Sequence, residues 1–466
     1  MAYSASSLSI PTLRNELSGR VIGPNDSGYD ETRALFLAGF DDRPAVILRP
    51  VNAEDVARGI AVARESGLPL AIRSGGHSGA GHGTTNGGIV IDVRDLKTLE
   101  VDAEKRTAWA GTGLSAAAYS KGVNDYGLAT GFGDTGSVGI GGITLSGGIG
   151  YLVRKYGMTI DSVIGAEVVT AKGEVLRVDE QSHPDLFWAL RGGGGNFGVV
   201  TRFKYQLHPV DHVYGGMLML PATADIIRQA IAITEAAPEE LSAIVNVMSA
   251  PPLPFIPEAY RGKLVVMFLL CYAGNADSGA QAVAPLRALG TPIVDMVRPI
   301  RYPEMFPPDD PSYHPTAIAR TMFLDHVDAT MAETMLDYLQ RSDAPMRVVQ
   351  LRALGGAMAR VPDDATAFAH RKSRILVSIA SFYTGAADRP ARAAWVAELS
   401  AALEQDDKGA YVGFLADEGE ARVRAAYPDR TWARLAAVKA KYDPENLFRR
   451  NQNVKPTESS VFSRQS

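Results

Sequence analysis

Glycine is concentrated in residues 131–150, and aliphatic side chains recur between the glycines. Ordering so many glycines is costly in backbone entropy, which disfavours an ordinary packed helix or strand. A flexible linker rich in glycine and serine would not carry aliphatic residues at regular intervals. The aliphatic residues in this stretch are Val138, Ile140, Ile143, Leu145 and Ile149. We therefore predict a folded loop that lies against a flat cofactor.

A second glycine loop, Arg73–Ser78, follows an apolar run at 68–72 that predicts a buried strand. Its two adjacent glycines let the backbone approach a ligand closely, and successive N–H groups can bind phosphate oxygens there. Arg73 adds a positive charge with a planar set of donors, and His77 adds a nucleophilic imidazole. Taken alone, the loop also fits an ordinary surface turn.

The chain of 466 residues is long enough for two or three domains with a large core. Hydrophobic residues make up 46% and charged residues 21%, which is typical of a soluble globular enzyme. The net charge of −5 gives no indication of a nucleic-acid partner. No apolar run reaches the roughly 18 residues of a membrane span, and residues 1–7 show no secretory signal, so we expect a cytoplasmic protein.

Cysteine occurs once, at Cys271, which excludes a disulfide within the chain and disfavours a cysteine-based metal site. Cys271 lies in the apolar run 264–272, so we expect a strand that carries a buried, inert thiol. No cluster of histidines or carboxylates has the spacing of metal ligands, and we predict no metal site.

The order of elements predicts an α+β protein. In the first part, a helix capped by Asn52 and ended by Gly67 separates two strands, and a hairpin is predicted at 163–178. After Val210 prolines become frequent and helices alternate with strands. We predict further helices at 222–236, 277–289, 329–341 and 431–442, and further strands at 89–92, 201–207, 263–272 and 375–382.

Four ordered motifs resemble the berberine-bridge-enzyme-like flavoproteins of the vanillyl-alcohol-oxidase superfamily, which have a PCMH-type FAD-binding domain. They are Arg73–Ser78, residues 138–150, residues 186–201, and Tyr442–Phe448 with Asn451-Gln452-Asn453. The resemblance covers nearly the whole chain.

This resemblance implies a two-part FAD-binding domain and a substrate-binding domain whose antiparallel sheet is covered by helices. The FAD-binding domain would comprise residues 1–210, with its core at about 40–210, and the chain would return to it at 416–456. Residues 211–415 would form the substrate-binding domain, and residues 457–466 would be a disordered tail.

The resemblance also implies a covalent bond between His77 and the flavin 8α-methyl group. His82 is the competing candidate, although it lies outside the phosphate-binding loop. Gly198 and Val200 would flank the adenine, and Asn451 and Asn453 would lie near the flavin ring. The other cofactor-binding residues that the resemblance implies are Arg73, Ser74, Gly75, Gly76, Ser78, Asp134, Thr135, Val138, Gly139 and Gly142.

Two positions depart from the pattern of many members in ways that bear on the cofactor and its oxidant. Thr135 stands where many members carry a cysteine that forms a second covalent bond to the flavin, so we expect a single bond, through His77. Val138 occupies the position that controls oxygen access in the family, where valine accompanies oxidase activity. We therefore expect O2 to accept the electrons.

The catalytic base of the alcohol- and sugar-oxidising members is also replaced. Ile149 stands in place of a tyrosine, and Tyr411-Val412-Gly413-Phe414 stands in place of their Tyr-x-Asn-Tyr pattern. Members with a glutamate base would carry it at Arg360. An alcohol needs a base for its hydroxyl proton, whereas the lone pair of a neutral amine stabilises the developing cation. The chain therefore resembles the hydroxynicotine oxidases more than the carbohydrate oxidases, and Tyr411 is the one candidate base.

The sequence thus predicts an FAD-dependent oxidase that removes hydride from a C–H next to nitrogen or oxygen of a small organic molecule. An amine or alkaloid-like substrate is favoured. The alternatives are a flavin dehydrogenase or an alcohol or carbohydrate oxidase of the same fold, and a non-enzymatic flavin-binding protein. The expected partners are the small-molecule substrate and O2, without nucleic acid or membrane, in a monomer or homodimer.

Overall fold

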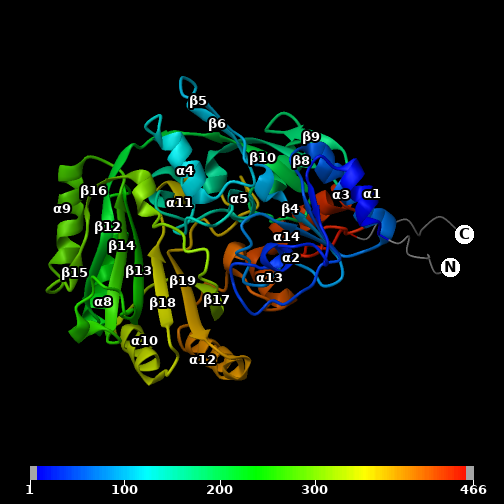
Figure 1. The fold of residues 1–466 in the computed structure, drawn as a ribbon. Coiled ribbons are helices and arrows are strands. Elements are labelled where there is room, and N and C mark those ends of the chain that lie inside the picture. Colours follow the sequence, from blue (N-terminus) through cyan, green and yellow to red (C-terminus); the bar gives the residue numbers. More distant parts are fainter. Residues whose placement is uncertain (1–7, 458–466) are drawn as a thin grey trace, which may run out of the picture.

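The computed structural model describes residues 8–457 of the chain. A group of small sheets, with strands up to Pro209, lies beside one large sheet built from residues 212–383 (Figure 1). This arrangement confirms the predicted α+β fold. Residues 1–7 and 458–466 lie outside the described part, so the predictions for the N-terminal segment and for most of the tail are not addressed.

The first sheet has four strands in the order β1-β2-β4-β3. Strand β4 is parallel to both β2 and β3, and β1 is antiparallel to β2. The strands are β1 (Arg20–Ile22), β2 (Val46–Arg49), β3 (Leu70–Arg73) and β4 (Ile89–Asp92). The helices of this part are α1 (Ile10–Glu16), α2 (Tyr29–Arg33) and α3 (Ala53–Ser66).

Helix α3 begins and ends where local side-chain chemistry predicted. The Asn52 side chain accepts a 2.8 Å hydrogen bond from the Asp55 N–H, and Gly67 ends the helix with a φ of +67°. Val56 and Ile60 of α3 belong to one buried cluster with residues of β2, β3 and β4. The strand–helix–strand unit is therefore confirmed, and the loop Arg73–Ser78 starts where β3 ends.

A second, antiparallel sheet has the order β5-β6-β10-β8-β9, and the predicted hairpin is the pair β8–β9. Its strands are β5 (Leu99–Asp102), β6 (Thr107–Gly111), β8 (Val163–Val169), β9 (Val175–Val178) and β10 (Val199–Gln206), and a separate two-stranded sheet joins β7 (Leu128–Ala129) to β11 (His208–Pro209). The associated helices are α4 (Ala116–Asn124), α6 (Val153–Tyr156) and α7 (Pro184–Leu190).

The glycine stretch 131–150 contains a helix, α5 (Ile140–Ser146), where we predicted a loop. Ile140 and Thr144 lie one helical turn apart and are both buried, so the stretch has an inward-facing side. A β-carbon on Gly141 would approach Thr112 and Ser74 to 3.0 and 3.1 Å, which explains a glycine inside this helix. The loop prediction was wrong for α5 because close packing outweighs the entropy that glycine loses.

The large sheet is antiparallel throughout and runs in the order β15-β12-β14-β13-β18-β19-β17, with β16 also paired to β12. Its strands are β12 (His212–Pro221), β13 (Leu241–Ser249), β14 (Leu264–Tyr272), β15 (Val294–Asp295), β16 (Arg298–Arg301), β17 (Thr316–Leu324), β18 (Arg347–Ala353) and β19 (Ile375–Tyr383).

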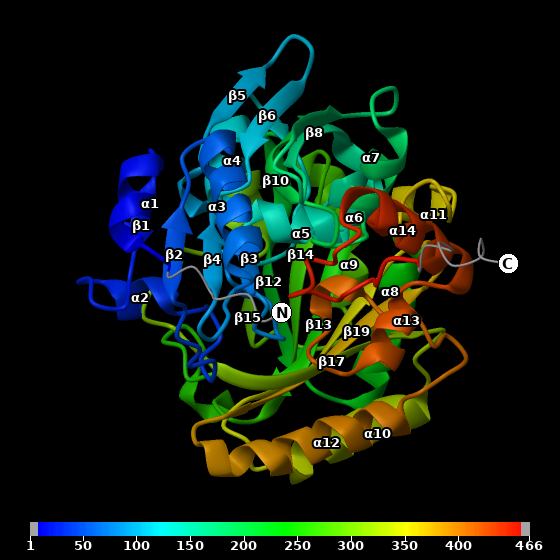
Figure 2. The same ribbon diagram turned by 90° about the vertical axis from the view of Figure 1, so that its right-hand side faces the viewer.

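Helices cover the outer face of this sheet (Figures 1 and 2). These helices are α8 (Ala224–Ala236), α9 (Ala276–Arg287), α10 (Ala329–Arg341) and α12 (Arg389–Ala402). Val245, Leu351 and Val377 point from the strands into the same apolar cluster as the helices. Because side chains alternate along a strand, Ile244 and Arg352 belong to the opposite, inner face, which turns toward the small sheets. The short helix α11 (Ala357–Arg360) follows β18.

The chain then returns to the first part through α13 (Glu420–Ala426) and α14 (Asp429–Tyr442), coloured orange to red beside the blue N-terminal elements in Figure 1. Lys439 of α14 is buried and donates to the Asn196 carbonyl at 2.7 Å and to the Asp443 carboxylate at 2.6 Å. A buried ammonium is tolerated only when it is paired in this way. The contact therefore fixes the C-terminal segment against the glycine loop that precedes β10.

Cys271 is buried in β14, and burial raises the pKa of its thiol, as expected for an inert cysteine. None of the helices within residues 8–457 is both long and apolar enough to cross a membrane. The same residues contain no group of three or more His, Cys, Asp or Glu side chains that could hold a metal ion.

Candidate functional site

The candidate site is a cavity of about 390 Å³ that lies where stretches far apart in the sequence meet. Its wall is drawn mainly from residues 70–83, 133–149, 194–200, 411–415 and 448–452. The wall therefore combines both glycine-rich stretches with the C-terminal segment, and only the folded chain can assemble it.

The loop Arg73–Ser78 contacts the glycine stretch backbone to backbone. Ser74 Oγ donates a 2.7 Å hydrogen bond to the Thr112 carbonyl. A β-carbon on Gly75 would overlap the backbone nitrogen of Gly139, and a β-carbon on Gly139 would overlap Ser74. Gly75 and Gly139 must therefore be glycines so that the two loops can meet.

Gly142 and Gly195 line the cavity for a different reason. Apart from the adjoining residues and the backbone of α5 itself, no atom of residues 8–457 lies within 4 Å of the position that a β-carbon would take at either residue. Both residues border the cavity, so the free space beside them is available to a ligand. A flat ring or a phosphate can approach exposed backbone of this kind closely.

Arg73 does not provide the free positive charge that we predicted for its loop. Its guanidinium is buried and pairs with Asp92 at 2.8 Å, because β3 and β4 place the two residues opposite each other. It also donates to the backbone carbonyls of Thr32 at 2.7 Å and Arg33 at 3.1 Å. The charge is therefore neutralised inside the sheet, where an unpaired guanidinium would be strongly unfavourable, although Arg73 still borders the cavity.

His77 lies half-buried in the wall, and its imidazole is stacked on the Phe36 ring with centroids 4.0 Å apart and planes inclined by 17°. Burial lowers the pKa of His77 to about 4, and a hydrogen bond to the Ser137 backbone opposes this shift. The imidazole is therefore neutral at pH 7. A neutral imidazole keeps a lone pair on one ring nitrogen, which makes it a nucleophile.

His82, the competing candidate, borders the same cavity. Burial and the nearby charge of Arg450 lower the pKa of His82 to about 4. Both imidazoles are thus neutral at pH 7, and both are within the site. Among residues 8–457, only His77 of the two has an aromatic ring stacked on it.

The predicted residues Asp134, Thr135 and Val138 all line the cavity. The Asp134 carboxylate is paired with Arg352 of β18 at 2.7 Å, a contact that no sequence motif indicated. Arg352 is 4% exposed and donates a further 3.0 Å hydrogen bond to the Ile149 carbonyl. This ion pair joins the glycine stretch to the inner face of the large sheet.

A chain of hydrogen bonds continues from Arg352 across the sheet. Its Nε and Nη2 atoms donate to Gln350 Oε1 at 3.2 and 2.7 Å, and Gln350 Nε2 donates to Asn246 Oδ1 at 2.9 Å. These residues were not predicted because their partners lie in remote parts of the sequence. The available signal was the alternation of Gln350 and Arg352 with the buried Val349 and Leu351.

Tyr411 lies in the wall just before the turn Val412–Phe414, not in a strand. The Gly148 N–H donates a 2.9 Å hydrogen bond to its hydroxyl, and burial raises the pKa of Tyr411 to about 12. The phenol therefore stays protonated at neutral pH. Phe414 and Ile149, which occupy the other two positions of the lost base motif, add apolar surface to the wall.

Arg360 is not part of the site. It is an exposed residue of α11 that pairs with Glu239 at 2.7 Å and does not border the cavity. The position assigned to a glutamate base by motif alignment is therefore on the surface.

The C-terminal segment contributes Asn451 and Gln452 to the wall, whereas Asn453 does not border the cavity. Asn451 Nδ2 donates to the Gly195 carbonyl at 2.9 Å, and its Oδ1 atom is buried without a partner among residues 8–457. A buried acceptor without a donor is unfavourable, so Asn451 fits a ligand that offers an N–H group. Gln452, which we did not predict, borders the cavity beside Asn451.

Gly198 and Val200 border the cavity as predicted. A β-carbon on Gly198 would lie 2.7 Å from both the Val168 side chain and the Val169 carbonyl oxygen. Glycine is needed here so that β10 can start close against β8.

Comparison with known proteins identifies the family to which this chain belongs. A model described as "FAD binding domain" matches residues 44–179, and one described as "Berberine and berberine like" matches residues 410–455. The chain is 31% identical to (R)-6-hydroxynicotine oxidase of Paenarthrobacter nicotinovorans over 94% of this chain and 97% of that protein. The chain belongs to the berberine-bridge-enzyme-like family of FAD-linked oxidoreductases.

Two further similarities agree with this berberine-like family. An FAD-linked oxidoreductase of Dictyostelium discoideum is 30% identical over 89% of this chain and 90% of its own length. The crystal structure of 6-hydroxy-D-nicotine oxidase from Arthrobacter nicotinovorans has a TM-score of 0.84 at 28% identity, covering 94% of this chain and 98% of that one.

The residues that line the cavity are suited to binding FAD. The space beside Gly142 and Gly195 can accept a flat ring or phosphates, and the orphaned Asn451 Oδ1 can accept a ring N–H. The first family match contains the loop Arg73–Ser78, and the second contains Tyr411 and Asn451. Both family matches therefore contribute to the wall, and residues 194–200 of the wall lie between them.

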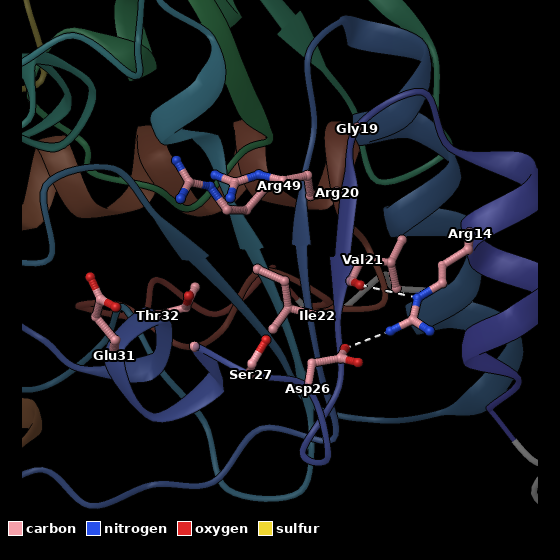
Figure 3. Close-up of a pocket in the computed structure, with 11 residues that line it drawn as sticks. Arg14, Gly19, Arg20, Val21, Ile22, Asp26, Ser27, Glu31, Thr32 and Arg49 are labelled. Carbon is pink, nitrogen blue, oxygen red and sulfur yellow. Dashed lines mark hydrogen bonds and ion pairs between the residues drawn. The ribbon is translucent and has the colours of Figure 1, made fainter.

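A second hollow, of about 580 Å³, lies beside α1, β1 and α2 and does not show the same features (Figure 3). Arg14 pairs with Asp26 at 2.5 Å, and Arg20 and Arg49 both pair with Asp95. Its arginines are therefore already neutralised, and none of the predicted cofactor residues borders it.

Proposed function

We propose that this FAD-linked oxidoreductase is an oxidase that removes hydride from a C–H next to nitrogen, or next to oxygen, of a small organic molecule and reduces O2 to H2O2. Amine or alkaloid-like substrates are favoured. The observation that carries this proposal is the apolar wall at the positions of the lost base motif. Ile149 and Phe414 border the cavity there, and the Tyr411 hydroxyl stays protonated at neutral pH.

A site of this kind suits an amine better than an alcohol. Oxidation of an alcohol carbon requires removal of the hydroxyl proton, which a positioned base accelerates by about 10²–10⁴-fold. The lone pair of a neutral amine instead supports the positive charge that develops when hydride leaves. The relative named (R)-6-hydroxynicotine oxidase supports the same direction.

We propose that the flavin-binding domain comprises residues 1–210 and 416–456, and that residues 211–415 form the substrate-binding domain. FAD, when bound, would accept the hydride and deliver the electrons to O2. His77 would hold it through a single covalent bond, since Thr135 cannot form a second one. Gly142 and Gly195 would let the backbone come close to it, and Ile149 and Phe414 would keep water away from the reacting carbon.

The proposal is tested by measuring H2O2 with purified protein and a panel of secondary and tertiary amines, alcohols and sugars. We expect turnover with at least one amine and faster turnover at higher pH, where more of the amine is uncharged. Turnover restricted to sugars would contradict the amine assignment. Flavin reduction without H2O2 in air would identify a dehydrogenase, and no reduction by any compound would support a non-enzymatic flavoprotein.

The covalent bond is tested separately by denaturing the protein in acid. Yellow colour should remain with the precipitated wild-type chain and be lost in His77→Ala. Colour that persists in His77→Ala and is lost in His82→Ala would reassign the bond to His82.

A further inference from the structure

The segment that carries Phe36 is tied directly to the histidine loop. Arg73 donates hydrogen bonds to the carbonyls of Thr32 at 2.7 Å and Arg33 at 3.1 Å. The Phe36 N–H donates to the Gly76 carbonyl at 3.3 Å. These bonds anchor the segment immediately before Phe36 and Phe36 itself, so the ring lies flat on the His77 imidazole at 4.0 Å.

The same segment is held from the other side by residues that precede β17 of the large sheet. Tyr313 packs edge-on against Phe36 with ring centroids 6.3 Å apart. His314 Nδ1 lies 3.0 Å from the Leu35 carbonyl, and the Ala38 N–H donates to the Pro315 carbonyl at 3.0 Å. Phe36 is therefore clamped between the histidine loop and residues 313–315.

We propose that Phe36 is a positioning residue for covalent attachment of the flavin: its ring fixes the plane of the His77 imidazole, and Tyr313 and His314 hold Phe36 in place. This inference rests on the proposed bond between His77 and the flavin. It adds a role for two segments outside the sequence motifs, one of which belongs to the proposed substrate-binding domain.

The geometry suits this role because the two nitrogens of an imidazole lie in the ring plane. Stacking covers one face of the ring and leaves both nitrogens accessible at its edge. A neutral imidazole carries its proton on one ring nitrogen and a lone pair on the other. With the plane fixed by Phe36, this lone pair has one direction in which to attack.

The bond-forming step balances with O2 as the oxidant. A C–N bond forms between the imidazole and the 8α-carbon, while one C–H bond of the 8α-methyl and one imidazole N–H bond break. The two protons and two electrons released reduce the flavin ring, and O2 then removes them as H2O2. Phe36 contributes no atom to this balance, and its effect is orientation alone.

The test compares covalent flavin in wild type, Phe36→Ala, Phe36→Leu and Phe36→Tyr. Each protein is incubated with excess FAD, and samples are precipitated in acid over time to measure the flavin that stays with the chain. Total flavin is measured on the native protein. We expect Phe36→Ala and Phe36→Leu to bind FAD but to form the bond at least about tenfold more slowly, since misorientation of this kind costs up to about 10²-fold.

Phe36→Tyr keeps a flat ring and should attach FAD at the wild-type rate. Tyr313→Ala should slow attachment less than Phe36→Ala does. Phe255→Ala and Tyr126→Ala are matched controls, because these aromatic residues are 42% and 55% exposed and do not border the cavity, and they should leave the rate unchanged. If Phe36→Ala holds no FAD, the comparison of Phe36→Leu with Phe36→Tyr decides.

The outcomes separate this inference from the proposed function. A wild-type chain without covalent flavin at residue 77 would overturn this inference and the proposed covalent bond, while the H2O2 assay would still decide the oxidase activity. A wild-type chain linked at His77, with Phe36→Leu linked equally fast, would overturn the role of Phe36 and leave the proposed function intact.

Discussion

We propose that the choice of electron acceptor depends on Val138. It borders the cavity within the glycine stretch and is partly exposed to it. A small side chain leaves room for O2 beside the flavin, and a longer one would fill that room. Substitution of Val138 therefore tests whether the protein is an oxidase, because reoxidation of the reduced flavin can be measured without the natural substrate.

We predict that Val138→Leu will slow reoxidation of the reduced flavin by air about tenfold, equivalent to about 1.4 kcal/mol in activation free energy. Stopped-flow absorbance after chemical reduction measures this rate. Reduction by substrate should change little, which serves as the internal control. An unchanged reoxidation rate would remove Val138 from the path of oxygen.

Tyr411 is the other residue whose role can be decided by one substitution. In Tyr411→Phe the Gly148 N–H loses its 2.9 Å partner, and we expect the free energy of unfolding to fall by about 1–3 kcal/mol. The pH dependence of flavin reduction should be unchanged below pH 10, because burial raises the pKa of Tyr411 to about 12. A loss of turnover exceeding a hundredfold at unchanged stability would instead identify Tyr411 as a catalytic residue.

At the scale of elements, strand β18 is joined to the glycine stretch by the ion pair between Arg352 and Asp134. Both side chains are largely buried, at 5% and 19% exposure. Removing one partner leaves an uncompensated charge, whereas removing both leaves none. The pair therefore couples the large sheet to the cavity wall. Comparing single and double variants distinguishes the effect of an unpaired buried charge from the effect of losing the contact.

We predict that Arg352→Gln will lower the free energy of unfolding by about 3–5 kcal/mol, and that adding Asp134→Asn will restore part of this loss. Urea unfolding followed by tryptophan fluorescence measures both. Arg360→Gln is the matched control, since its pair with Glu239 is exposed and should contribute less than about 1 kcal/mol. Equal losses in the single and double variants would argue against an uncompensated charge.

Elements with local signals were predictable from the sequence. Asn52 and Gly67 mark the ends of α3, and the loop Arg73–Ser78 follows its strand as expected. Helix α5 was missed because Gly141 is explained by contact with Ser74 and Thr112, which are remote in sequence.

Within the site, the sequence indicated residues whose role depends on their own backbone or ring. It did not indicate which partners these residues meet in the folded chain. Asp134 and Arg352 are separated by 218 positions, and no pattern near either residue indicates that the other is its partner. Arg73 was assigned to a phosphate because its partner Asp92 becomes visible only when β3 and β4 lie side by side. The stacking of Phe36 on His77 likewise depends on a crossing of segments that composition and periodicity do not encode.

At the scale of the whole molecule, buried neutral imidazoles make the free energy of unfolding depend on pH. His208 is stacked on Tyr156 with centroids 4.1 Å apart, and burial lowers the pKa of His208 to about 4. Burial is also the main reason that the pKa of His82 is lowered to about 4. In the unfolded chain each imidazole titrates near its ordinary pKa of about 6.5. The unfolded state therefore binds more protons between these values.

We predict that the free energy of unfolding is constant with respect to these groups above about pH 6.5 and falls as the pH decreases toward 4. Each imidazole contributes up to about 3 kcal/mol to this loss. Urea midpoints between pH 4 and 8 measure the slope. His208→Phe keeps the stack on Tyr156 but cannot titrate, so its slope should be shallower, whereas the exposed His326→Phe should match wild type.

The placement of Asn451 and Gln452 in the cavity wall has a consequence for biosynthesis. A ribosome must translate these residues before the wall can close, whatever has already folded. Enclosure of the cofactor therefore follows synthesis of the whole large sheet, which precedes these residues in the chain. A premature stop codon shortly before Asn451 would spare most of the chain and still abolish the flavin pocket.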